Sequence, residues 1–121
     1  IPHPYDRVRY SPLNESQLST ILPYIDIVEV FNSRTTLLRD NDRAKGLAEK
    51  HGFAQGAGSD AHSTMELGQV KVIMPPFNDQ GDFLASLRGA RIVGKRSSPL
   101  VHLISTLNKL RSKYLRFSYA H

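Results

Sequence analysis

The stretch DIVEVF, residues 26–31, decides the fold class, because it is short, rich in β-branched residues and almost continuously apolar. A strand of this kind is typical of a sheet that is covered on both faces. The next segment, DRAKGLAEKHG at 42–52, has apolar residues on one helical face and Gly52 at the position of a C-cap. A second short strand is expected in FAQGAGSD, residues 53–60. Strand, helix and strand in this order predict a parallel pair with a helix packed over it.

The flanking segments extend this alternation of helices and strands. On the N-terminal side, NESQLSTILPYI predicts a helix with Asn14 as N-cap and Gln17 at the capping-box spacing. On the C-terminal side, the expected elements are a strand at 69–74, a short helix at 82–89, a strand at 91–94 and a helix at 98–114. The sequence therefore predicts an α/β fold, with a mainly parallel sheet and flanking helices.

The charges of the chain divide at about residue 82. Residues 1–82 hold eight Lys or Arg and all eleven acidic residues, whereas residues 83–121 hold eight basic residues and no acid. A basic last third indicates a negatively charged neighbour, which could be nucleic acid, a phosphorylated substrate or an acidic surface of the same protein. The chain has no cysteine, which excludes disulfides and thiolate metal ligands, and no apolar run of transmembrane length. We expect a cytoplasmic protein with no membrane partner.

The loop GAGSDAHS, residues 56–63, carries the clearest chemical signal. In parallel α/β folds, functional groups gather in the loops after the strands, where Asp60 and His62 are expected. A carboxylate and a neutral imidazole together suit Zn, Mn or Fe, although a hydrogen-bonded turn is the commoner explanation of an isolated D-x-H. His3 reaches the same edge if residues 1–3 are the tail of a strand. The neighbouring serines, Ser59 and Ser63, are expected to shape the loop.

Five segments together resemble a known family. IPHPYDR, IDIVEVFNSRT, NDRAKGLAEKHG, GAGSDAHS and MELGQVKV occur in this order within residues 1–74. The series resembles the C-terminal half of PHP-domain proteins, the polymerase and histidinol phosphatase family, including the PHP-associated C-terminal region. The resemblance implies a distorted (β/α)7 barrel with several Mn, Zn or Fe ions at its strand ends. It also implies that the intact protein is an enzyme, a hydrolase that cleaves phosphate esters with a metal-activated hydroxide.

The same resemblance assigns metal ligands and shows what is missing. His3 matches the family's HP motif, and Asp60 and His62 match its last D-x-H motif, which makes all three metal ligands and the latter two catalytic. The family's opening H-x-H pair, and the Glu and His ligands after it, have no counterpart in these 121 residues. Three ligands would leave each ion mostly hydrated. We therefore expect an incompletely ligated, inactive fragment: 1–74 as the last part of the barrel and 75–121 as a basic helical extension.

Other residues near this edge have supporting roles in the prediction. Arg7 and Arg34 lie in expected edge loops and could grip a phosphate, with a solvated surface charge as an equal alternative. Glu29 interrupts an apolar strand and must be paired, hydrated or functional. We expect Glu29 and Asn32 to support the ligands from behind. The substrate could be a phosphorylated small molecule, a nucleotide or an oligonucleotide.

Two other functions remain open at the level of sequence. The basic C-terminal region, with Lys109, Arg111, Lys113 and Arg116 in one expected helix, could make the chain a nucleic-acid-binding module, which a steep salt dependence of binding would reveal. A non-catalytic scaffold is the other possibility, and the absence of H-x-H from the complete gene product would favour it. The missing N-terminal half of the barrel is an expected partner, and open sheet edges also predict self-association.

Overall fold

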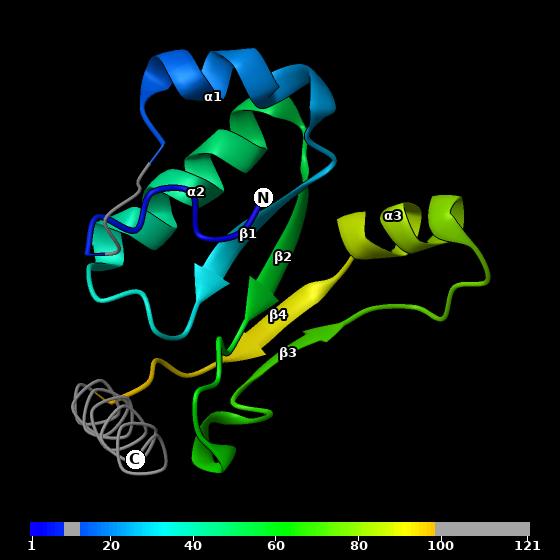
Figure 1. Ribbon diagram of the computed structural model, residues 1–121. Helices are drawn as coiled ribbons and strands as arrows, with labels where there is room; N and C mark the ends of the chain where they lie inside the picture. Colours follow the sequence, from blue (N-terminus) through cyan, green and yellow to red (C-terminus); the bar gives the residue numbers. More distant parts are fainter. Residues whose placement is uncertain (9–12, 99–121) are drawn as a thin grey trace, which may run out of the picture.

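A computed structural model describes residues 1–8 and 13–98 of the chain, and the predicted helix at 98–114 falls outside this part. The described part is mixed α/β (Figure 1). Its elements are the helix α1 (Glu15–Ile21), the 3₁₀ turn η1 (Leu22–Tyr24), the strand β1 (Ile27–Asn32), the helix α2 (Leu38–His51), the strand β2 (Ala54–Gly58), the 3₁₀ turn η2 (Thr64–Glu66), the strand β3 (Val70–Ile73), the helix α3 (Gln80–Arg88) and the strand β4 (Arg91–Gly94). The strands and helices predicted within this part are all present.

The unit β1–α2–β2 confirms the predicted parallel pair. Ile27 pairs with Ala54 at one end of the two strands, and Asn32 pairs with Gly58 at the other. Helix α2 crosses between the strands and ends as the sequence predicts, since Gly52 has φ 69° and its N–H donates to the carbonyl of Ala48. Only glycine adopts this left-handed conformation readily, so Gly52 turns the chain into β2. The two strands thus finish at the same edge.

The apolar core lies between α2 and one face of β1. Val28 and Ala48 are fully buried, and Leu47 and Leu18 are nearly so. Helix α1 contributes Leu18 to this core. The helix begins with a capping box, in which Asn14 Oδ1 accepts from the Gln17 N–H at 2.8 Å and Gln17 Oε1 accepts from the Asn14 N–H at 3.1 Å. Burial of these side chains removes apolar surface from water and is the main stabilising contribution in this unit.

The two faces of β1 differ, although the sequence predicts burial of both. Val28, Val30 and Asn32 are buried, whereas Ile27, Glu29 and Phe31 on the other face are only half-buried. The edge of β1 that does not face β2 is hydrogen-bonded to Ile1. The amino group of Ile1 donates to the Ile27 carbonyl at 2.7 Å, and the Glu29 N–H donates to the Ile1 carbonyl at 2.9 Å. These two bonds follow the pattern of a parallel ladder, so Ile1 lies where a strand beside β1 would lie.

The strands β3 and β4 differ from the prediction in direction. They pair antiparallel, with Ile73 opposite Arg91 and Val70 opposite Gly94, so the parallel arrangement holds for β1 and β2 only. A parallel crossover needs a connection that returns along the whole strand. The short helix α3 instead lies beyond the end of the ribbon, and two residues after it the chain enters β4 beside the end of β3 (Figure 1).

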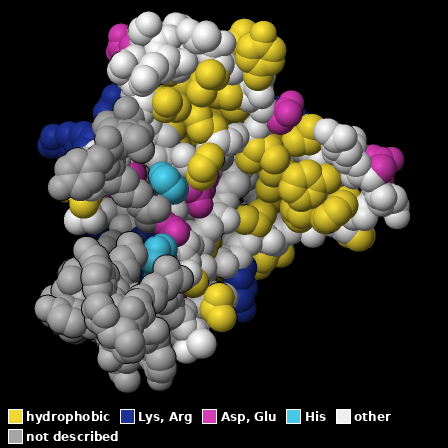
Figure 2. All heavy atoms as spheres, in the orientation of Figure 1, with side chains coloured by type: hydrophobic (Ala, Val, Ile, Leu, Met, Phe, Trp, Pro, Cys, Tyr) yellow, Lys and Arg dark blue, Asp and Glu magenta, His cyan; other side chains and the backbone are white. Residues whose placement is uncertain are grey.

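The surface around α3 is partly apolar (Figure 2). Phe77 and Ile73 are about half-exposed, and Phe77 meets Phe83 edge to face. Among residues 1–8 and 13–98 the strands form two separate two-stranded sheets and no closed barrel. No helix in this part of the chain is long and apolar enough to span a membrane.

Candidate functional site

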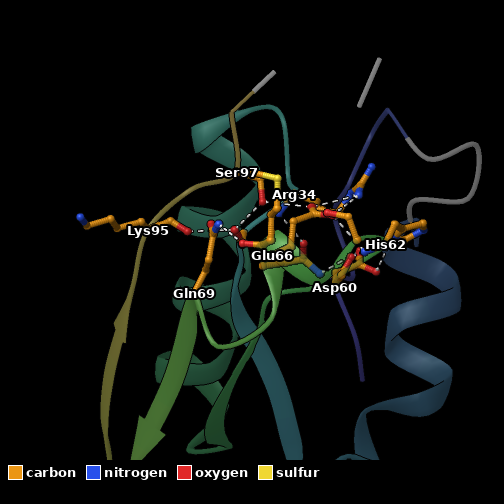
Figure 3. Close-up of polar contacts among 11 residues, drawn as sticks. Arg34, Asp60, His62, Glu66, Gln69, Lys95 and Ser97 are labelled. Carbon is orange, nitrogen blue, oxygen red and sulfur yellow. Dashed lines mark hydrogen bonds and ion pairs between the residues drawn. The ribbon is translucent and has the colours of Figure 1, made fainter. Parts of the chain in front are cut away.

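The loops that follow β1 and β2 lie side by side, because the two strands are parallel and end at one edge (Figure 3). The Ser33 N–H donates to the carbonyl of Gly58 at 3.0 Å and joins the starts of the two loops. Asn32, the last residue of β1, points its amide towards the other loop, with Nδ2 3.4 Å from Asp60 Oδ2. The edge therefore brings Asn32 and Asp60 together.

The D-x-H loop has a defined local geometry. His62 Nδ1 lies 2.7 Å from the carbonyl oxygen of Asp60 and 3.8 Å from Asp60 Oδ1. A carbonyl oxygen only accepts, so this hydrogen bond places a proton on Nδ1 and leaves the lone pair of the neutral ring on Nε2. Metal-binding histidines commonly have their other ring nitrogen fixed in this way. Asp60 itself has φ 51°, a left-handed conformation that is uncommon outside glycine.

Glu29 lies beside the D-x-H loop and accepts hydrogen bonds from Asn32 and His3. Asn32 Nδ2 lies 3.3 Å from both of its carboxylate oxygens, and the backbone N–H of His3 donates to its Oε2 at 2.8 Å. A Cβ on Gly58 would lie 2.6 Å from Glu29 Oε1, so the absence of a side chain there makes room for the carboxylate. The structure thus places the predicted supporting residues, Glu29 and Asn32, between the segments that carry His3 and Asp60.

The donor chemistry at this edge fits a divalent cation. Asp60 offers a carboxylate, and the tautomer of His62 leaves Nε2 able to ligate. The number of donors is smaller than a complete site needs: within residues 1–8 and 13–98 no three His, Asp or Glu side chains gather closely enough to hold a metal ion. His3 approaches the cluster through its backbone and has φ 23°, a second uncommon conformation.

Glu66 is buried behind the D-x-H loop, and the sequence prediction gave it no role. Its side chain is 1% exposed, and its two oxygens lie 3.0 and 3.1 Å from Nη1 of Arg34, which is 5% exposed. Glu66 Oε2 also accepts from the His62 N–H at 3.0 Å and from Ser63 Oγ at 3.0 Å, and Oε1 accepts from Ser97 Oγ at 3.3 Å. One carboxylate therefore connects the loops after β1 and β2 with the segment after β4 (Figure 3).

Opposing effects set the ionisation of Glu66. Burial raises the pKa of this carboxyl, because desolvation disfavours the charged form. The effect of burial is outweighed by the groups that stabilise the charged form, so the pKa lies below its usual value of 4.5. These groups are the His62 N–H, the Ser63 hydroxyl, the charge of Arg34 and the Ser97 hydroxyl. Glu66 is a carboxylate at neutral pH. A local signal was present in the sequence, since Ser63 and Glu66 have capping-box spacing.

The two predicted phosphate-binding arginines have different surroundings. Arg34 is buried against Glu66, so its guanidinium faces the interior. Arg7 is about half-exposed, and its Nε donates to Asp40 Oδ1 at 2.9 Å while its backbone N–H donates to Asp40 Oδ2 at 3.2 Å. Of the two, only Arg7 has a side chain that a solvent-borne phosphate can approach.

The comparison with known families supports the resemblance seen in the sequence. The profile of the family described as PHP-associated matches residues 39–92. This segment is thus similar to the PHP-associated region of PHP-domain proteins. It extends from α2 into β4 and includes Asp60, His62 and Glu66, whereas His3, Glu29 and Arg34 precede it.

A relative extends the similarity without naming a function. The chain is 38% identical over 81 residues to an uncharacterized protein of Methanocaldococcus jannaschii, an alignment that covers 64% of this chain and 34% of that protein. The chain thus spans about a third of the length of the curated relative it matches. No solved structure matches the chain.

Proposed function

We propose that the chain is the C-terminal part of a metal-dependent phosphoesterase of the PHP type, with Asp60 and His62 as ligands from its last ligand loop. The hydrogen bond from His62 Nδ1 to the Asp60 carbonyl carries the proposal, because it fixes the ring in the tautomer whose Nε2 can ligate. The PHP-associated region, which includes both residues, provides the family context. The remaining ligands are supplied by the N-terminal half of the barrel or by another chain.

The fold of the described residues is compatible with a place at the end of a (β/α)7 barrel. The strand–helix–strand unit of β1, α2 and β2 is the repeating unit of such barrels. Ile1 continues the parallel ladder on the free edge of β1, where the preceding strand of a barrel would pair. The half-buried face with Ile27, Glu29 and Phe31 would then point to the barrel interior.

In this proposal the chain's own residues hold and orient the reacting groups. Divalent ions (Mn, Zn or Fe), when bound there, would make hydroxide available near neutral pH and offset charge on the phosphate. Asp60 and His62 present donors from one loop, and Asn32 orients Asp60 while its amide also faces Glu29. Arg7, rather than the buried Arg34, is the proposed contact for a phosphate ester of a small molecule, nucleotide or oligonucleotide.

The test is metal content and phosphatase activity of the protein expressed from its complete gene. Bound Mn, Fe and Zn are measured by elemental analysis, together with hydrolysis of p-nitrophenyl phosphate, for the wild type and for Asp60→Ala combined with His62→Ala. The control combines Asp42→Ala with His51→Ala, which removes an exposed Asp and an exposed His from α2. We expect the first double variant to lose metal and activity and the control to keep both. Equal metal content in the wild type and both variants would refute the proposal.

A further inference from the structure

The burial of Glu66 contrasts with its immediate neighbours. Met65 and Leu67 are 78% and 67% exposed, whereas Glu66 is 1% exposed. Burying a carboxylate costs free energy unless the group is paired with a cation and hydrogen-bonded. Glu66 has both kinds of partner. The turn η2 thus directs the side chain of Glu66 into the interior. The contacts that this side chain makes there indicate its role.

Two of those contacts hold the D-x-H loop. Glu66 Oε2 accepts from the backbone N–H of His62 and from the hydroxyl of Ser63, both at 3.0 Å. The His62 ring is held separately, through Nδ1 and the Asp60 carbonyl at 2.7 Å. Backbone and ring of His62 are therefore fixed from two sides, and the position of the imidazole depends on where the Glu66 carboxylate lies.

The carboxylate is in turn held from two directions. Arg34, from the loop after β1, donates to both oxygens. On the other side, Ser97 Oγ lies 3.3 Å from Glu66 Oε1, and Ser97 is fixed by its backbone N–H, which donates to the Ser33 carbonyl at 2.9 Å. Ser33 Oγ donates to the Lys95 carbonyl at 2.8 Å, and the Lys95 N–H donates to the Gln69 carbonyl at 3.1 Å. Residues 95–97 thus attach the end of β4 to the loop after β1 and to the chain that follows the D-x-H loop.

We infer that Glu66 is a positioning residue for His62 and Asp60, held in place by Arg34 and by residues 95–97. This inference rests on the proposed function, because it gives the D-x-H loop a metal to position. Residues 95–97 follow the PHP-associated region, which ends at residue 92, so the positioning device extends beyond the segment that the family profile covers. Partners behind metal ligands typically change metal affinity by about 10- to 100-fold when removed.

The test measures Mn²⁺ affinity of the protein expressed from its complete gene, at a temperature where every variant is fully folded. Glu66→Gln removes the charge, and Ser97→Ala removes only the contact from the segment after β4. The matched controls are Glu49→Gln, an exposed carboxylate 3.8 Å from Lys45 Nζ, and Ser19→Ala, an exposed hydroxyl bonded within α1. Thermal unfolding and deuterium exchange of a peptide that spans residues 59–67 are recorded for each variant.

We expect Glu66→Gln to weaken Mn²⁺ binding by about tenfold or more, with faster exchange in the peptide, and Ser97→Ala to have the same effects to a smaller extent. Both controls keep the wild-type affinity. Should Glu66→Gln not fold, Ser97→Ala carries the test, since a merely structural role would lower its unfolding temperature and leave Mn²⁺ affinity unchanged. Wild-type affinity in Ser97→Ala and in a folded Glu66→Gln overturns the inference and leaves the proposed function standing. No Mn²⁺ binding by the wild type overturns both.

Discussion

The two sheets formed by the described residues are held in different ways. The β1–β2 sheet packs its apolar face against α2, around Val28, Leu47 and Ala48. The β3–β4 ribbon and α3 bury few side chains. Among the described residues of β3, α3 and β4, Leu87 alone is buried. What attaches this ribbon to the site is polar, through Glu66 and the backbone of residues 95–97. The first sheet depends on burial of apolar surface, whereas the second combines the partly buried Ile92, which packs against the same core, with a small number of directed polar contacts.

This difference explains where the candidate site lies. The parallel unit supplies a rigid edge with two loops, and the ribbon supplies the contacts that restrain those loops from outside. A buried ion pair with hydrogen bonds is directional and restricts the positions of its donors and acceptors. A ligand loop that must hold its donors in place benefits from contacts of this kind.

The largest predicted effect tests whether the polar attachment is essential. Arg34→Met leaves the Glu66 carboxylate buried without its ion-pair partner, which we expect to lower the free energy of unfolding by about 3–5 kcal/mol. Urea denaturation followed by circular dichroism measures the loss. The double variant with Arg34→Met and Glu66→Leu should recover part of it, because no unpaired charge is then buried, although the His62 N–H loses its acceptor. A loss below 1 kcal/mol in Arg34→Met, on the scale of an exposed pair, would contradict the assigned burial.

The next effect compares the apolar parts of the two regions. Leu47 and Leu87 are 6% and 5% exposed, and only Leu47 belongs to the core with Val28 and Val30. We expect Leu47→Ala to cost about 3–4 kcal/mol and Leu87→Ala about 2, because a site with fewer buried neighbours collapses more easily around a cavity. The same urea experiment measures both losses. Equal losses would show that α3 is packed as tightly as α2.

The sequence predicted the first region well because its signals are local. A short, almost continuously apolar run rich in β-branched residues located β1, and Gly52 marked the end of α2. The direction of β4 was not predictable in this way, since it depends on where α3 packs rather than on any pattern within the strand. The Asp60–His62 loop was proposed from a local motif, whereas two partners of Glu66, Arg34 and Ser97, lie 32 and 31 residues away in segments that have no periodicity. Local patterns carry no information on such pairings.

Acid should weaken the polar attachment before it affects the apolar core. Because the pKa of Glu66 is lowered in the folded chain, its contribution to stability is complete above the usual value of 4.5 and is lost as pH falls through the lower folded value. The groups that face this carboxyl are Arg34, the His62 N–H and two serine hydroxyls. Stability measured by urea unfolding between neutral pH and pH 3 should fall less steeply in Glu66→Gln than in the wild type. Parallel curves would mean that Glu66 ionises alike in the folded and unfolded chains.

The smallest predicted effect is a gain in stability beside the ion pair. Thr35 is 2% exposed, and its Oγ1 is buried with no hydrogen-bond partner among the described residues. Valine has nearly the same shape, so Thr35→Val removes the cost of a buried hydroxyl and should stabilise the chain by about 1 kcal/mol or less. Thr36→Val, at an exposed neighbour, is the matched control, with no expected change in the urea midpoint. If Thr35→Val is destabilising instead, the hydroxyl makes a stabilising contact in the folded chain, and its assignment as an unsatisfied group is wrong.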